Sequence, residues 1–144
     1  MADSGRWFID TWAWLVLAND RDPSFAAVHR LRTGAMRRPG AWVTTDYILD
    51  ETLTRLFARA PYSRARRFSE AVFDSSRLGL VDIESVTPER FRSAWRLRLR
   101  FRDKPDISFT DMTSFAVMAE LGISQAITGD AHFEQVGLGF RKLP

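Results

Sequence analysis

The residues WFID (7–10) and AITGD (126–130) decide the fold, because each is a short, mainly apolar run that ends in an aspartate. Such a run has the length of a buried strand rather than that of a helix. In open α/β folds the carboxyl ends of the strands lie at one edge of the sheet, where the working groups gather. If the two strands are neighbours, Asp10 and Asp130 therefore lie over the same edge. Asp is also common in turns, so either carboxylate alone fits a turn as well as a site.

Short apolar strands alternate with helices along the rest of the chain. We expect strands at 7–9, 41–44, 80–83, 123–128 and, at an edge, 140–143. We expect helices at 13–18, 23–32, 46–60, 63–76, 88–102 and 108–121. Capping residues and glycines bound several helices, among them Asp22 and Gly34 around the second, and Thr87 before the fifth. This alternation predicts a single three-layer α/β/α domain over residues 1–144 with a mainly parallel central sheet.

The composition is that of a soluble globular protein. Hydrophobic residues make up 45% of the 144 residues and charged residues 27%, which excludes a disordered chain. Cysteine is absent, which excludes disulfides and thiolate metal sites and suits a cytoplasmic location. The polar N-terminus predicts no signal peptide, and the longest apolar run, 12–18, is shorter than the roughly 20 residues of a membrane span. The net charge of +3 permits a polyanionic partner without requiring one.

Asp111 is a third acid in a conspicuous position, in the first turn of the helix expected at 108–121. Helical spacing puts it on the same face as Phe115 and Met118. An acid at a helix start often only offsets the helix dipole. A lone carboxylate on a core-facing stripe is costly to bury, however, and a shared cation would remove that cost. The pattern therefore favours a functional site at Asp111.

Glu51 is a fourth candidate acid, but the apolar periodicity of its helix argues against a place in the site. The apolar stripe of helix 46–60 consists of Leu49, Leu53, Leu56 and Ala60. Glu51 lies largely on the opposite side, where a solvated glutamate paired with Arg55 at i+4 is the ordinary interpretation. Asp46, best explained as a helix-start acid, and Asp50 compete with it for any role.

Four segments of the chain share their order and spacing with a known family. They are FIDTWAW (8–14), TTDYILDETLTRL (44–56), DISFTDMTSFAVMAELGI (106–123) and QAITGDAHFEQVGLGFRKL (125–143). Taken together they resemble the PIN-domain nuclease family, and within it the VapC-like toxins of type II toxin–antitoxin pairs. The resemblance covers nearly the whole chain.

The resemblance implies a metal-dependent endoribonuclease that hydrolyses RNA phosphodiester bonds. The family's metal-site acids fall on Asp10, Glu51, Asp111 and Asp130, with Thr128 as the hydroxyl residue of the T-x-D motif. Mg²⁺ or Mn²⁺ is the expected cofactor, because these ions prefer carboxylate oxygens and phosphate. The implied partners are an RNA substrate, a cognate antitoxin protein and a second copy in a homodimer, with no membrane.

Several residues depart from the family pattern or allow two interpretations. Trp12 and Trp14 are bulky where many relatives carry smaller residues, which predicts a different pocket wall. Asp106 either supports the metal site or lies in a loop, and the loop is favoured. His29 reads as a surface or boundary residue. His132 helps to place phosphate or has a structural role, and the structural role is favoured.

The segment 90–104 holds seven basic residues and one acid. Two stripes share this helix: a basic one at Arg92, Arg96 and Arg100, and an apolar one at Phe91, Trp95 and Leu99. The basic stripe is either a phosphate track leading to Asp111 or a solvated face whose apolar side packs on the sheet. An antitoxin-docking surface is a third interpretation. A smaller patch with the same ambiguity consists of Arg64, Arg66 and Arg67.

Two other functions fit the same sequence. One is a non-catalytic PIN-fold module that binds RNA or a protein. Four convergent carboxylates count against it, because they repel phosphate. The other is a housekeeping RNA-processing nuclease, which differs from a toxin only in its biology.

Overall fold

A five-stranded sheet forms the centre of the computed structural model, which describes residues 3–144. Its strands are β1 (Trp7–Ile9), β2 (Trp42–Thr45), β3 (Val81–Glu84), β4 (Gln125–Ile127) and β5 (Arg141–Leu143). Every neighbouring pair is parallel, in the order β3-β2-β1-β4-β5. The predicted α/β class is therefore confirmed, with β5 at an edge as expected.

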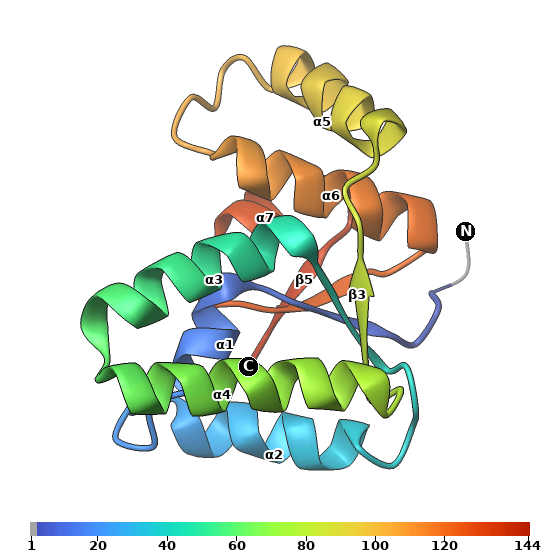
Figure 1. Cartoon of the computed structure of the whole chain (residues 1–144). Coiled ribbons are helices and arrows are strands. Elements are labelled where there is room, and N and C mark those ends of the chain that lie inside the picture. The colour runs from blue at the N-terminus through green and yellow to red at the C-terminus, as the bar shows by residue number, and fades with distance from the viewer. Residues whose placement is uncertain (1–2) are drawn as a thin grey trace.

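Helices cover the sheet on both sides. They are α1 (Thr11–Leu17), α2 (Phe25–Ala35), α3 (Asp46–Arg59), α4 (Tyr62–Arg77), α5 (Pro88–Arg100), α6 (Phe109–Leu121) and α7 (His132–Gln135). In Figure 1, α5 and α6 lie above the strands and α2 and α4 lie below them. The four-residue α7 was not predicted, because one turn is too short to show a helical period. No helix within residues 3–144 combines the length and the apolar character that a membrane span requires.

The strand order places a switch point at the centre of the sheet. From β1 the chain adds β2 and β3 on one side and then β4 and β5 on the other. Ile9 lies opposite Ile127 in the pairing of β1 with β4, so Asp10 and Thr128 follow two neighbouring strand ends. The two aspartate-ended strands are therefore neighbours, which is the condition under which Asp10 and Asp130 lie over the same edge of the sheet. Ligands of open α/β sheets bind at such a switch point.

Three helix ends lie where the sequence predicts them. At the start of α5, Thr87 Oγ1 accepts a hydrogen bond from Arg90 N at 3.2 Å. At the start of α6, Ser108 Oγ accepts one from Asp111 N at 3.1 Å. Gly122 ends α6 with a φ of 67°, a conformation that glycine adopts without steric cost. These ends hold Asp111 in the first turn of α6.

The bounds of α2 differ from the prediction of residues 23–32. Asp22 Oδ1 accepts a hydrogen bond from Ser24 N at 2.8 Å, which makes a turn and delays the helix to Phe25. Gly34 was expected to stop the helix but lies inside it. A glycine weakens a helix by about 1 kcal/mol relative to alanine without ending it.

The core is aromatic on both faces of the sheet. Phe115 lies 5.0 Å from Phe133 between ring centroids, and Trp14 lies 5.9 Å from Trp42. Trp14 is only 3% exposed and also contacts Phe68, so it is a core residue and not part of a pocket wall near the acids. The expectation for Trp14 was therefore wrong.

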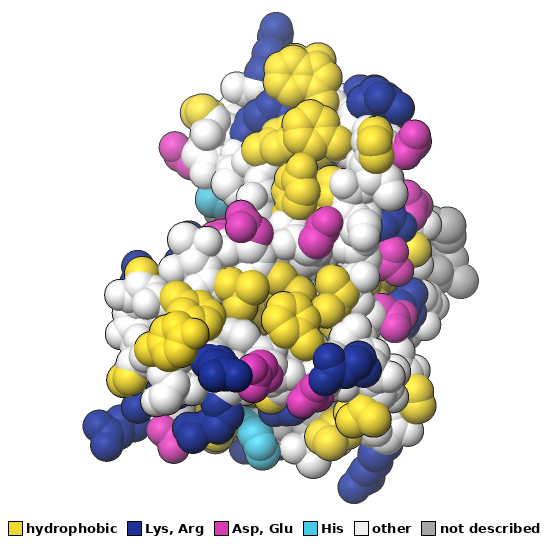
Figure 2. All heavy atoms as spheres, viewed as in Figure 1, with side chains coloured by type: hydrophobic (Ala, Val, Ile, Leu, Met, Phe, Trp, Pro, Cys, Tyr) yellow, Lys and Arg dark blue, Asp and Glu magenta, His cyan; other side chains and the backbone are white. Residues whose placement is uncertain are grey.

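The apolar stripe of α5 does not pack on the sheet, which corrects one interpretation of this helix. Phe91, Trp95 and Leu99 are 45%, 53% and 55% exposed, and hydrophobic side chains gather over α5 at the top of Figure 2. The reason is that α5 is an outer layer that packs against α6 through Ala94. Residues 111–118 of α6 are consequently all buried, on every side of the helix.

Two of the seven basic residues of segment 90–104 have structural roles. Arg90, with 13% of its side chain exposed, donates to Glu84 Oε2 at 2.8 Å and to Glu120 Oε2 at 2.5 Å. The Arg98 guanidinium holds the loop after α5 by donating to three backbone carbonyl oxygens, those of Phe101, Lys104 and Ile107. The basic residues of this segment therefore do not form a uniform track of free side chains along α5.

We expect Arg90→Ala to lower the free energy of unfolding by about 1–3 kcal/mol, because it leaves Glu84 and Glu120 without their partner. Arg92→Ala on the exposed side of the same helix is the matched control and should change it by less than about 0.5 kcal/mol. Urea unfolding followed by circular dichroism measures both. Equal effects of the two variants would contradict the structural role of Arg90.

Candidate functional site

An open pocket of about 370 Å³ lies where β1 and β4 end. Its wall consists of Asp10, Thr11, Trp12, Glu51, Arg55, Asp106, Ser108, Asp111, Gly129, Asp130 and His132. All four acids predicted for the site line this one pocket. Asp106 is exposed and lies in a turn, which agrees with the favoured loop interpretation, and it also lines the pocket.

Asp10 is held at the end of β1 and is only 6% exposed. It precedes α1 but its side chain makes no capping hydrogen bond to that helix. Its Oδ2 instead accepts a hydrogen bond from Thr128 Oγ1 at 2.7 Å. Burial raises the pKa of Asp10 to about 6, although the bond from Thr128 opposes this rise. Asp10 is thus more than a turn residue.

Asp111 projects from the first turn of α6 and is 8% exposed. Burial, followed by the charges of Asp10 and Asp130, raises the pKa of Asp111 to about 7. Two buried carboxylates with raised pKa values in one pocket form an arrangement that a cation would stabilise. Because α6 is buried all round, helix facing alone would not have singled out Asp111.

His132 lies against two of the acids. Its Nδ1 is 3.1 Å from Asp130 Oδ2 and 3.5 Å from Asp111 Oδ2. Its backbone N donates to Asp130 Oδ1 at 2.8 Å, which fixes the turn into α7. One potential ligand atom from each of these three residues lies within 4.8 Å of the others, so together they have the spacing of a metal site. His132 thus has the structural role that was favoured and also faces the pocket.

The position of Glu51 corrects the periodicity argument. The buried residues of α3 are Ile48, Leu49, Thr52 and Leu56. Thr52 was not counted as a core position, yet it is buried, and its hydroxyl is satisfied there by donating to the Ile48 carbonyl at 2.7 Å. The buried face therefore turns toward Glu51, which lies at its margin and lines the acid pocket. The expected pair with Arg55 is present at 2.7 Å.

Thr128 connects the two strand ends. Its Oγ1 donates to Asp10 Oδ2 and accepts a hydrogen bond from Asp130 N at 3.0 Å, and the residue is fully buried. The next residue, Gly129, has no room for a side chain, because a Cβ there would lie 2.8 Å from Trp12 Cε2. Sequence reasoning missed this close approach, which no sequence pattern signals.

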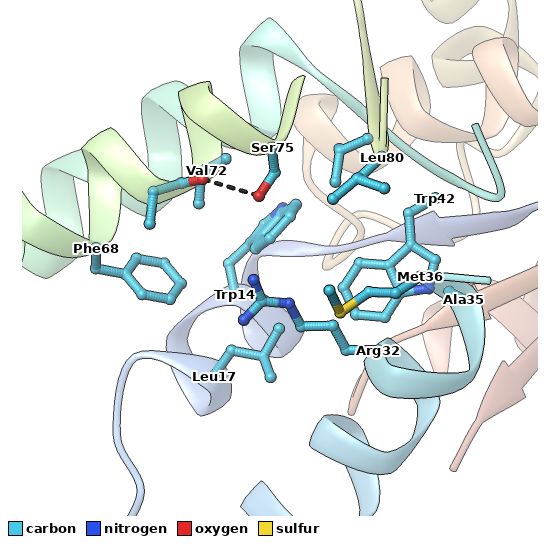
Figure 3. Close-up of a pocket in the computed structure, with 12 residues that line it drawn as sticks. Trp14, Leu17, Arg32, Ala35, Met36, Trp42, Phe68, Val72, Ser75 and Leu80 are labelled. Carbon is cyan, nitrogen blue, oxygen red and sulfur yellow. Dashed lines mark hydrogen bonds between the residues drawn. The ribbon is translucent and has the colours of Figure 1, made fainter. Parts of the chain in front are cut away.

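A separate apolar cavity of about 60 Å³ lies between α1, α2 and α4 (Figure 3). Trp14, Trp42 and Phe68 form much of its wall, and Arg32 is the charged residue that lines it. Since no carboxylate is among its lining residues, this cavity is unsuited to a hard metal ion.

Comparison with known proteins supports a nuclease. The family model described as PIN domain matches residues 7–138. The 23S rRNA-specific endonuclease VapC20 of Mycobacterium tuberculosis is 34% identical over 130 residues, which cover 90% of this chain and 93% of the relative.

Two solved structures share the fold. The crystal structure of Mycobacterium tuberculosis VapC20, described as a sarcin-ricin loop cleaving toxin, matches with a TM-score of 0.74 and 32% identity over 90% of this chain and 94% of its own. VapBC2 from Rickettsia felis, bound to a DNA fragment from its promoter, matches with a TM-score of 0.74 over 96% of this chain and 98% of its own. At 10% identity, that second likeness supports the fold alone.

Thr128→Val should weaken the site, because it removes both the donor to Asp10 and the acceptor for Asp130 N. We expect the free energy of unfolding to fall by about 1–3 kcal/mol. In the wild type the hydrogen bond from Thr128 lowers the pKa of Asp10, so its loss should raise that pKa further. Thr128→Ser keeps the hydroxyl and is the control. Carboxyl carbon NMR titration would contradict the role of Thr128 if the pKa of Asp10 were the same in the valine variant.

The raised pKa values predict how metal-free stability depends on pH. The folded protein holds protons on Asp10 and Asp111 up to pH values of about 6 and about 7, whereas the unfolded chain loses them near 4. The stability that these protons provide at low pH is therefore lost as the pH rises, on the order of 4 kcal/mol between pH 5 and pH 8 in EDTA. Asp111→Asn should reduce this loss, and Asp50→Asn on the exposed face of α3 should not. Urea unfolding at several pH values measures the free energy of unfolding. If it depended on pH equally in the two variants, the raised pKa of Asp111 would be contradicted.

Proposed function

The chain belongs to the PIN domain family, and on that basis we propose that it is an endoribonuclease toxin that hydrolyses RNA phosphodiester bonds. The likeness to VapC20, an endonuclease specific for 23S rRNA, supports ribosomal RNA as the substrate class. A cell that makes such a toxin needs an inhibitor of it, so we also propose a cognate antitoxin protein as a partner. Homodimerisation, a cytoplasmic location and a single domain over residues 1–144 stay predictions.

The observation that carries the proposal is the pair of buried carboxylates Asp10 and Asp111 beside Asp130. We propose these three and Glu51 as the ligands of Mg²⁺ or Mn²⁺, with His132 next to them. Carboxylate oxygens suit both ions, and the pocket is open enough to leave positions for water and a substrate phosphate. When bound, the ion would neutralise charge on the phosphate and make the attacking water more acidic.

The chain's own residues would prepare this site. Thr128 donates to Oδ2 of Asp10 and so holds this carboxylate in place at the pocket wall. The raised pKa values mean that protons on Asp10 and Asp111 must leave before a cation can bind, so affinity for the ion should increase with pH. A non-catalytic RNA-binding module is disfavoured, because it gains nothing from buried acids that repel phosphate.

A hairpin RNA carrying the sarcin-ricin loop tests the proposed activity. We expect cleavage in Mg²⁺ or Mn²⁺ and none in EDTA. Asp10→Asn and Asp111→Asn should each lower the rate by about 100-fold or more, because several kcal/mol of transition-state stabilisation are lost. Asp50→Asn on the exposed face of α3 is the matched control and should cleave normally. Cleavage that persists in EDTA, or in both aspartate variants, would refute the proposal.

A further inference from the structure

A second groove, of about 440 Å³, adjoins the acid pocket. The two hollows share Trp12 and Arg55 in their walls, so they lie side by side on the surface. The groove runs from α1 to the corner between α3 and α4, where Arg59 and Arg64 line it. A further hollow continues along α4 past Arg64. Each hollow therefore adjoins the next through shared wall residues, from the acid pocket to α4.

The groove carries cationic side chains that the protein itself does not neutralise. Arg59 and Arg64 are exposed and form no ion pair with any residue of the described part of the chain. Arg67 lines the continuation along α4 and is equally unpaired among residues 3–144. The acids lining these hollows are only Asp22 and Asp20. Concave surfaces with unpaired arginines attract phosphates, which a guanidinium binds in a bidentate manner.

Trp12 lies at the junction of the pocket and the groove. It is partly exposed, and its indole ring packs against Gly129, the residue before Asp130. This contact fixes an aromatic side chain next to the acids. Unpaired bases stack on such rings, and stacking tolerates any base because every base has a π face.

We propose that this groove binds the single-stranded RNA that flanks the cut phosphate. Backbone phosphates lie along Arg55, Arg59 and Arg64, and one unpaired base stacks on Trp12. Without RNA, Arg55 pairs with Glu51 at 2.7 Å. A phosphate in the groove competes for that guanidinium and leaves Glu51 for the acid pocket. The inference rests on the proposed ribonuclease function and moves the RNA path from α5 to the side of α3 and α4.

The first test measures RNA affinity without cleavage, by fluorescence anisotropy of a labelled single-stranded oligonucleotide in EDTA. The double variant Arg59→Ala with Arg64→Ala should bind about tenfold more weakly or worse. Its slope of log affinity against log salt should fall by about 1.4, since each lost phosphate contact on a single strand removes about 0.7. Arg92→Ala with Arg96→Ala is the matched control, because it removes the same charge from the exposed face of α5. It should bind as the wild type does.

The second test isolates the stacked base. Trp12→Ala should weaken binding by about tenfold, whereas Trp12→Phe keeps an aromatic ring and should retain most of the affinity. An oligonucleotide of abasic ribose phosphates has no base to stack. It should bind wild type and Trp12→Ala equally, which a merely misfolded variant would not do.

Three results would overturn the inference. They are unchanged binding by the Arg59/Arg64 variant, an equal loss in the Arg92/Arg96 control, and a loss of antitoxin inhibition without a loss of RNA affinity. The last result would make the groove a protein-binding surface. Because binding is measured in EDTA, the proposed function fails separately: groove-dependent binding without cleavage in Mg²⁺ or Mn²⁺ would refute the nuclease and retain the groove.

Discussion

The hydrogen bond from Thr128 Oγ1 to Asp10 Oδ2 is the contact on which the site depends. It joins the ends of two neighbouring parallel strands, and the in-register pairing of β1 with β4 makes it possible. The same oxygen of Thr128 accepts the backbone N–H of Asp130, so the turn that carries the last acid is fixed from the same atom. One buried hydroxyl thus sets the geometry of two carboxylates from distant parts of the chain.

Other elements of the fold add charged side chains around these two strand ends. Asp111 reaches the strand ends from α6, a helix that α5 covers on its outer side. The burial that results makes the acid pocket electrostatically unfavourable when it holds no cation. Arg59 and Arg64 lie outside it, along α3 and α4, and Arg55 lines both hollows, so the region suited to a metal ion lies beside the region suited to phosphates. A substrate has to meet both regions at once, and Trp12 lies where they adjoin.

The sequence predicted the parts of this arrangement that local patterns determine. Strand ends placed Asp10 and Asp130 at one edge of the sheet on the condition that their strands are neighbours, and capping residues placed Asp111 in the first turn of α6. The failures have physical causes. Thr52 is a polar residue that is buried with its hydroxyl hydrogen-bonded within α3, so a stripe of apolar residues alone misplaced the buried face that Glu51 borders. One of the interpretations of α5 placed its apolar side on the sheet, but α6 already fills the layer against the sheet. The periodicity of apolar residues reveals neither a helix that packs against a second helix nor a buried polar residue that hydrogen-bonds within its own helix.

The contact between Gly129 and the Trp12 ring has an evolutionary consequence. With tryptophan at residue 12, no side chain fits at residue 129, because its Cβ would lie 2.8 Å from the indole. A relative with a smaller residue at the position of Trp12 is free of this restriction. The two positions should therefore vary together among homologues. A larger residue at position 129 should be tolerated only where a smaller residue has already replaced tryptophan at position 12.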